Sequence, residues 1–317
     1  MQSISTHFKQ GFSLVQKTLP YMGMRLLIYG IYALGAIIYF LIAFLLTRIF
    51  GGAGGIIMLV MIGIFGAFYY WSRRYLLYMI KAGHVAVFTE LYEHGSLPSG
   101  TSQFQYGKDL VKRRVKDLSI LFTVDALVDG ILRTFSRSVA SIADLLPLPG
   151  LEGIARAGTA IINRALTYVD EAIFSYNILH DEENLWASSK AGVILYAQSW
   201  KPLLKTAVAV WLVEKVFFVL VLILWMIPFG TFALMTSSDG LKAVFLIVAI
   251  ILAVLTDRAV FEPVALATMV ITYQDTVKEM TPDPQWEAKL ESVSEKFREL
   301  KQKAMNAASG SAEAPAS

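Results

Sequence analysis

The sequence predicts an all-α integral membrane protein in which two transmembrane helical hairpins flank a helical amphipathic middle region. Composition is the first reason: 56% of the 317 residues are hydrophobic and 17% are charged, whereas soluble domains average about 45–50% apolar and about 25% charged residues. The second reason is that long apolar segments occur in two pairs. The third is that a short link rich in glycine or serine joins the members of each pair, as expected for antiparallel helices connected by a turn.

The lengths of the apolar segments suit membrane-spanning helices, although the second segment is short for a full span. A hydrocarbon core of about 30 Å requires roughly 20 helical residues. The first segment has no charged residue between Arg25 and Arg48, and the second closes at Arg73 and Arg74. The four segments comprise residues 26–46, 56–71, 216–234 and 241–273.

The basic residues predict the orientation of these segments. The two links are residues 51–55 and 236–240, and if both face one side of the membrane, that side carries only Arg48 and Lys242. The other 26 of the 28 basic residues then lie on the opposite side. Basic residues near membrane helices stay cytoplasmic. We therefore expect a multi-pass protein of the cell's inner or plasma membrane, with the N-terminus, the C-terminus and the middle region in the cytoplasm.

Five regions follow from this topology. They are an N-terminal amphipathic helix at residues 1–22, the first transmembrane hairpin at 23–80, the middle region at 81–206, the second transmembrane hairpin at 207–275, and a cytoplasmic C-terminal helix with a disordered tail at 276–317. The middle region allows two interpretations. It is either a packed cytoplasmic domain or a set of helices lying in the inner leaflet, with basic residues against anionic lipid.

Both ends of the chain carry apolar stripes at helical spacing. The N-terminal stripe, typical of a helix at a membrane interface, comprises Phe8, Phe12, Val15 and Leu19. The C-terminal stripe keeps a heptad spacing and comprises Trp286, Leu290, Val293, Phe297 and Leu300. A heptad stripe favours a short coiled-coil seam between the subunits of a homo-oligomer. The alternative is that this helix packs on its own domain.

The fourth apolar segment contains the candidate site. Asp257, Arg258 and Glu262 interrupt a run that otherwise extends from residue 241 to residue 273. Ionisable residues at membrane depth are costly and indicate a polar pathway or a buried pair. Arg258 and Glu262 are four residues apart, so they share a helix face, and Pro263 removes a backbone donor beside them. Alternatively, the span ends near Thr256 and the charges lie at the cytoplasmic interface.

The remaining residues give no sign of catalysis or of a bound cofactor. There is no cysteine, which excludes disulfides, thiol nucleophiles and cysteine zinc sites. The four histidines are too scattered to indicate a metal site. A net charge of +3 is too small to indicate a nucleic-acid binder. We therefore expect no enzyme activity, no cofactor, no metal and no nucleic-acid partner, and the expected partners are the lipid bilayer and further copies of the chain.

Three stretches before the third apolar segment suggest a family. Residues 168–178 form a helix, a short polar link follows, and residues 186–192 and 199–204 lie in an amphipathic helix that leads to a closing pair of spans. This layout, together with residues 264–274 of the last segment, resembles the C-terminal half of choline transporter-like proteins. The resemblance covers residues 105–280. It implies a helical membrane transporter, whereas members of that family are longer and have more spans.

These observations predict two alternative functions. The first is an oligomeric transporter or channel-like protein for a small solute or ion, with a polar pathway past Asp257, Arg258 and Glu262. The second is a non-transporting membrane scaffold or adaptor, whose middle region and C-terminal helix bind partners. In the second case the charges in the fourth segment are structural pairs.

Overall fold

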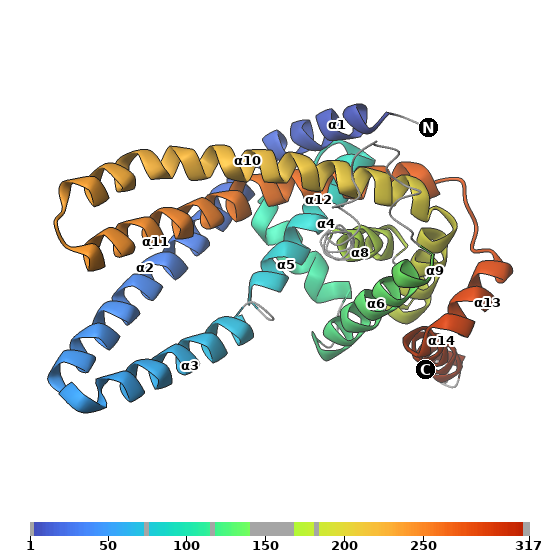
Figure 1. The fold of residues 1–317 in the computed structure, drawn as a ribbon. Helices are drawn as coiled ribbons and strands as arrows, with labels where there is room; N and C mark the ends of the chain where they lie inside the picture. The colour runs from blue at the N-terminus through green and yellow to red at the C-terminus, as the bar shows by residue number, and fades with distance from the viewer. Residues whose placement is uncertain (1–2, 73–75, 115–117, 140–167, 181–183, 313–317) are drawn as a thin grey trace. The chain divides into compact units, whose positions relative to one another are not determined.

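The computed structural model describes residues 3–72, 76–114, 118–139, 168–180 and 184–312, and every regular element in these ranges is helical (Figure 1). The all-α prediction is therefore confirmed for the described residues. The helices are, in chain order, α1 (Ile4–Lys17), α2 (Leu19–Ile49), α3 (Gly54–Ser72), α4 (Tyr78–His94), α5 (Gln103–Arg114), α6 (Leu118–Val139), α8 (Val169–Leu179), α9 (Leu185–Gln198), α10 (Trp200–Met235), α11 (Asp239–Thr256), α12 (Glu262–Val277), α13 (Pro284–Val293) and α14 (Glu295–Ala312).

Four stretches of the described chain are helical, long and apolar enough to cross a membrane. They are Leu19–Ile49, Gly51–Ser72, Trp200–Met235 and Val244–Val277. The 31 residues of α2 extend about 46 Å at about 1.5 Å per residue, which exceeds the thickness of a hydrocarbon core. These four helices indicate that the chain is a membrane protein, whereas their arrangement as two transmembrane hairpins remains a prediction.

The chain divides into two compact units. Unit 1 comprises Met1–Thr18, Gly83–Lys215 and Val264–Ser317, and unit 2 comprises Leu19–Ala82 and Val216–Pro263. Unit 2 therefore contains α2, α3 and α11, with the second part of α10. Unit 1 contains the N-terminal helix, the middle region and the C-terminal helices.

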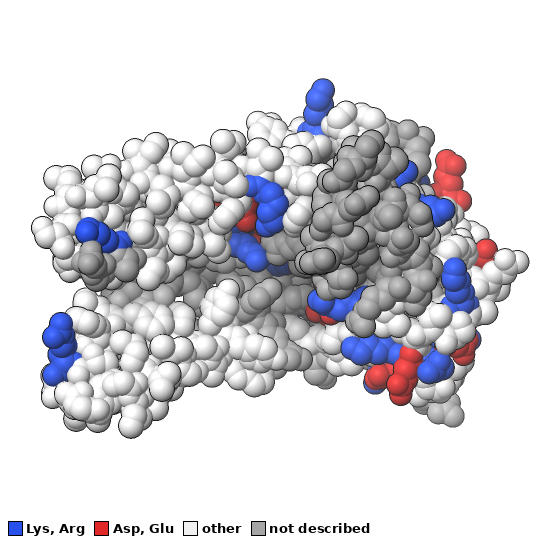
Figure 2. All heavy atoms as spheres, in the orientation of Figure 1, with Lys and Arg blue, Asp and Glu red and all other residues white. Residues whose placement is uncertain are grey.

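The helices of unit 2 contact one another through a small number of polar and aromatic groups. The Tyr39 hydroxyl on α2 donates a hydrogen bond to the Met61 carbonyl on α3 at 2.7 Å, and Tyr39 also packs against the Phe65 ring. The Trp225 indole on α10 donates to the Thr256 hydroxyl on α11 at 3.1 Å. Many large apolar side chains of these helices are exposed in the single chain, and Figure 2 shows the surface over α2, α3 and α11 as mostly uncharged. Such a surface is expected to face lipid or another apolar partner.

Unit 1 has a dense core in which helices distant in sequence pack together. The α9 helix contacts α6, α8, α13 and α14. The Tyr273 hydroxyl of α12 donates to the Gly192 carbonyl of α9 at 2.8 Å, and the Gln274 amide donates to the Ser175 hydroxyl of α8 at 2.7 Å. The largest fully buried side chains of the core include Phe135, Tyr196, Tyr273, Ile131 and Ile173. These contacts show that the described helices of the middle region pack on one another, and its cytoplasmic placement stays a prediction.

The N-terminal helix forms, but its buried face differs from the predicted stripe. The buried residues of α1 are His7, Gly11, Leu14 and Val15. Phe12 is 50% exposed, and Leu19 lies beyond the end of the helix, at the start of α2. A Cβ atom on Gly11 would lie 2.8 Å from the backbone nitrogen of Thr268 on α12. The close approach that this glycine permits sets which face of α1 is buried, and the interfacial placement of α1 remains a prediction.

The C-terminal stripe is interrupted, so the prediction of one continuous helix is wrong. Ser294 is extended (φ −131°, ψ 114°) and separates α13 from α14, where its hydroxyl accepts a hydrogen bond from the Phe297 backbone N–H. Leu290, Phe297 and Leu300 are fully buried within the single chain, and α14 contacts α6 and α9. Trp286 packs edge-on against Phe135 of α6, while Val293 is 37% exposed. Most of the residues of the predicted oligomer seam are thus buried inside unit 1 in the single chain, and a seam between subunits stays a prediction.

Candidate functional site

The candidate site is a charge network around Glu262 in unit 2. The Arg25 guanidinium of α2 donates a hydrogen bond to Glu262 Oε2 at 2.8 Å. Glu262 Oε1 lies 3.8 Å from Nζ of Lys81 and 3.8 Å from Nη1 of Arg258. The Arg25 side chain is 2% exposed and the Glu262 side chain 8%. One nearly buried carboxylate is therefore shared by three cations that come from α2, α4 and the segment before α12.

A π-helical turn positions the acidic residues of this network. The turn spans Asp257–Phe261 and joins α11 to α12, and the Glu262 backbone N–H donates to the Asp257 carbonyl five residues earlier. Pro263 follows directly and has no N–H with which to continue the helix ladder. Single π-helical turns within α-helices occur frequently at functional sites. The proline that the sequence analysis noted thus coincides with a change of helix type rather than with a break.

The network lies at the ends of the apolar segments. Arg25 directly precedes the charge-free residues 26–46, and Asp257 follows the apolar end of α11. The links at residues 51–55 and 236–240 lie at the opposite ends of these segments. Along these helices the network therefore lies away from both links, and its depth in a membrane stays a prediction.

The structure brings two of the three predicted residues, Arg258 and Glu262, into contact and adds Arg25 and Lys81, while Asp257 is the chain neighbour of Arg258. Asp257 is 7% exposed, and Arg258 approaches Glu262, although 3.8 Å is longer than a usual N–H···O hydrogen bond. From the sequence, Arg25 was only a boundary of the first apolar segment, and Lys81 had no predicted role. The only early signal for Arg25 was its position as the last charge before the first long charge-free run.

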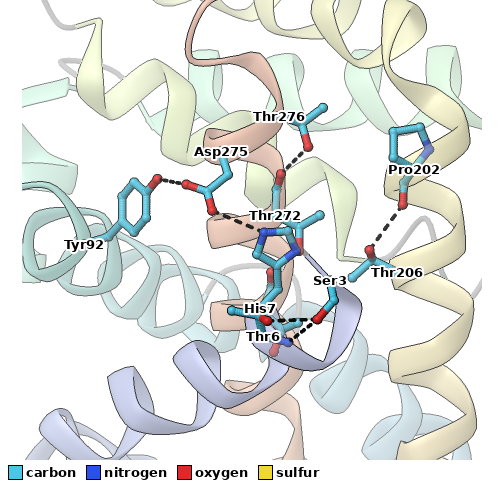
Figure 3. Close-up of polar contacts among 10 residues, drawn as sticks. Ser3, Thr6, His7, Tyr92, Pro202, Thr206, Thr272, Asp275 and Thr276 are labelled. Carbon is cyan, nitrogen blue, oxygen red and sulfur yellow. Dashed lines mark hydrogen bonds and ion pairs between the residues drawn. The ribbon is translucent and has the colours of Figure 1, made fainter. Parts of the chain in front are cut away.

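A second polar cluster lies in unit 1 around Asp275 of α12. In Figure 3, His7 of α1 and Tyr92 of α4 both point toward the Asp275 carboxylate. His7 Nε2 lies 3.2 Å from Asp275 Oδ2, and the Tyr92 hydroxyl donates to Oδ1. Burial, followed by the hydrogen bond to Asp275, raises the pKa of Tyr92 above its ordinary value. Both carboxylate oxygens are engaged, so the cluster joins α1, α4 and α12 and has the features of a structural contact.

A third set of charges lies on the C-terminal helices of unit 1. The Lys301 ammonium lies 3.2 Å from Glu287 Oε1 and 2.8 Å from Glu291 Oε2. Lys190 of α9 reaches the same Glu287 oxygen at 3.4 Å. The hydrogen bonds to Glu291 and Glu287 raise the pKa of Lys301. This network resembles the one at Glu262 in its sharing of a carboxylate, but its side chains are 24% to 40% exposed.

Among the described residues, no group of three or more His, Asp or Glu side chains could hold a metal ion. The described residues thus define a helical protein with four candidate membrane spans, two of which are joined by the buried Arg25–Glu262 pair. No protein-family model, no curated protein and no solved structure matches this chain. The resemblance to choline transporter-like proteins therefore stays a prediction.

Proposed function

We propose that this protein is a transporter or channel-like protein for a small solute or ion, and that the Glu262 network forms a polar step at the inner end of its membrane helices. The observation that carries the proposal is the position of the acidic residues. Asp257 and Glu262 are buried; Asp257 begins, and Glu262 directly follows, a π-helical interruption of the candidate span Val244–Val277. Interrupted membrane helices that carry polar groups are typical of transporter binding sites.

The sharing of Glu262 gives the network a means of rearranging. Lys81 and Arg258 both approach Oε1 at 3.8 Å, while Arg25 occupies Oε2. A cation can leave Glu262 without stranding the carboxylate, because two other cations remain beside it. An ion or polar solute that reaches this end of the helices would exchange with one of these partners. The network would then act as a gate that opens by replacing one ion pair with another.

The proposed topology has two transmembrane hairpins, with both links outside the cell and both termini in the cytoplasm. Since the chain has no cysteine, single cysteines report accessibility without background. Gly52→Cys and Ser237→Cys should react with an impermeant thiol reagent added to intact cells. Gln302→Cys should react only after the membrane is permeabilised. Labelling of Gln302→Cys in intact cells would overturn the proposed orientation.

The protein is further proposed to be a homo-oligomer that assembles through its membrane helices. In the most apolar 18 residues of α2 and of Gly51–Ser72, 6% of the residues are buried in the single chain, compared with 28% in each of the other two spans. Subunit contacts through the first pair would cover side chains that are otherwise left to lipid. Cross-linking in native membranes between single cysteines on α2, such as Ile37→Cys and Leu41→Cys, should give dimers or larger products.

The alternative function is a membrane scaffold whose unit 1 binds partners. The observation in its favour is that the buried charges of unit 2 have partners from several helices, as structural pairs do. In that case the network would hold α2, α4 and α12 together and nothing would move through it.

Flux across proteoliposomes distinguishes the two functions. Vesicles containing the protein would be tested for K⁺, Cl⁻ and proton flux with entrapped dyes, and for uptake of radiolabelled choline. Flux of any of them that falls at least about tenfold in Glu262→Gln, and is retained in the control Glu279→Gln, supports transport. Glu279 is an exposed carboxylate beyond the end of α12. Wild-type vesicles that pass none of these solutes would favour the scaffold.

A further inference from the structure

The Glu262 network carries more positive than negative charge. Arg25, Lys81 and Arg258 face Glu262, and Asp257 is adjacent to Arg258 in the chain, so among the described residues three cations stand against two carboxylates. A buried Arg–Glu pair is neutral by itself. The surplus cation therefore belongs to the outer part of the network, where the Arg258 side chain is 31% exposed and that of Lys81 is 15% exposed.

The geometry leaves donor capacity on Arg258. Its Nη1 atom is 3.8 Å from Glu262, which is an ion-pair distance but too long for a usual hydrogen bond. A guanidinium has five N–H donors in a planar fork, and this fork matches the oxygens of a phosphate group. Arg25, by contrast, is fixed by its short bond to Glu262 and by the Arg258 carbonyl at 3.4 Å. Arg258 is thus the member of the network that can bind an outside anion.

The position of the network indicates where such an anion would come from. Arg25 marks the start of a charge-free run of membrane-helix length, and Arg258 follows the apolar α11. This is the level at which the phosphates of phospholipids lie, next to the hydrocarbon core. Helices with exposed apolar surfaces adjoin it, so acyl chains have a surface on which to pack.

We propose that Arg258, assisted by Lys81, binds the phosphate of an anionic phospholipid headgroup, and that this lipid is a bound component of unit 2. The already formed Arg25–Glu262 pair holds both cations in place before the lipid arrives. Because the site needs only the charge network and the membrane, the proposal does not depend on transport and applies equally to a scaffold.

Lipid titration of the purified protein tests this proposal. The thermal midpoint in a neutral detergent would be followed as phosphatidylglycerol or phosphatidylcholine is added to mixed micelles. We expect phosphatidylglycerol to raise the midpoint of the wild type more than phosphatidylcholine does. In Arg258→Gln the lipid concentration for half of the effect should rise at least about tenfold, which corresponds to about 1.4 kcal/mol. Arg48→Gln is the matched control, because Arg48 lies at the opposite end of α2, and it should respond as the wild type does.

Two further arms make the test decisive. Arg258→Lys keeps the charge but loses the planar fork, and it should show an intermediate response if it folds as the wild type does. Inorganic phosphate at the same concentration should give no shift; an equal shift would show a soluble anion site and overturn the lipid assignment. Equal responses of Arg258→Gln and Arg48→Gln, in native mass spectra of retained lipid as well as in the melting curves, would also overturn it.

Discussion

The networks at Glu262 in unit 2 and at Glu287 in unit 1 are built alike but lie in different surroundings. Glu262 shares its oxygens among three cations, with a shortest distance of 2.8 Å. Glu287 shares one oxygen between Lys190 and Lys301, at 3.4 and 3.2 Å. The Glu262 side chain is 8% exposed and the Glu287 side chain 24%.

The comparison shows that the distance between the charges does not by itself determine how much an ion pair contributes to the free energy of unfolding. Around Glu287, water solvates each charge when its partner is removed, and exposed pairs contribute only about 0–1 kcal/mol. Around Glu262, little water replaces a lost partner. Removing one member of a buried pair costs about 3–5 kcal/mol because the other charge stays buried. A glutamate thus makes a weak surface contact in unit 1 and a strongly stabilising contact between helices in unit 2.

The largest effect should come from Glu262→Gln. This change leaves the 2%-exposed Arg25 without its carboxylate, and it should lower the free energy of unfolding by about 3–5 kcal/mol. Guanidinium-induced or thermal unfolding in detergent, monitored by circular dichroism, measures this. A change below about 1 kcal/mol would place Glu262 in water and remove the difference between the two networks.

A packing change that alters no charge is expected to have an effect of intermediate size and tests tight backbone packing in unit 1. A Cβ atom on Gly107 of α5 would lie 2.4 Å from the Gly83 carbonyl oxygen of α4. Because the contact is with backbone, Gly107→Ala should lower the free energy of unfolding by about 1–3 kcal/mol. Gly95→Ala would be a poor control because Gly95 has a positive φ of 74°. Gly63→Ala on α3 meets nothing within 4 Å and should be nearly neutral or slightly stabilising.

Tyr92→Phe tests the cluster at Asp275, where a 25%-exposed carboxylate is paired with the nearly buried His7. Loss of the hydrogen bond to Asp275 should lower the free energy of unfolding at pH 8 by about 1.5–3 kcal/mol, the range for bonds to charged groups. The raised pKa of Tyr92 means that its contribution is fully present below the ordinary tyrosine pKa of about 10 and is lost as pH rises through the folded-state value. The difference in stability between wild type and Tyr92→Phe should therefore shrink above about pH 10. A difference that stays constant from pH 8 to pH 11 would contradict the assignment.

The smallest effect should come from Glu287→Gln. Lys301 keeps Glu291 at 2.8 Å, and Lys190 is 28% exposed and can be hydrated. We expect a loss of about 0–1 kcal/mol, which decreases further at high salt. A loss as large as that of Glu262→Gln in the same assay would show that burial does not separate the two networks.

The sequence predicted the elements of the fold better than their partners. Apolar length and helical spacing were enough to predict the four candidate spans and an all-α chain. The heptad stripe correctly contained residues that are buried, namely Leu290, Phe297 and Leu300. It did not predict the break at Ser294, because a heptad pattern shows which face of a helix is apolar but not what covers that face. The Ser294 hydroxyl accepts a hydrogen bond from the Phe297 backbone N–H and so caps the start of the second helix, α14.

The candidate site was predicted in part for a similar reason. Arg258 and Glu262 lie four residues apart, so their proximity follows from local helix geometry. Arg25 is 237 residues from Glu262 in the chain, and no local pattern connects the two. The π-helical turn also lies outside a simple periodicity argument, since it replaces the bond to residue i−4 by one to i−5. His7 and Asp275, 268 residues apart, were missed for the same reason as Arg25.

The coupling free energy between Arg25 and Glu262 directly tests whether this pair is buried and stabilises unit 2. Arg25→Gln, Glu262→Gln and the double variant would be unfolded under identical conditions in the same detergent. The account predicts that the double variant loses less stability than the sum of the two single losses, by about 1–3 kcal/mol, because no stranded member of the pair remains. It also predicts that Glu262→Gln costs more than Arg25→Gln, since Glu262 keeps Lys81 and Arg258 when Arg25 is removed. Additive and nearly silent single changes would show a solvated network and contradict the account.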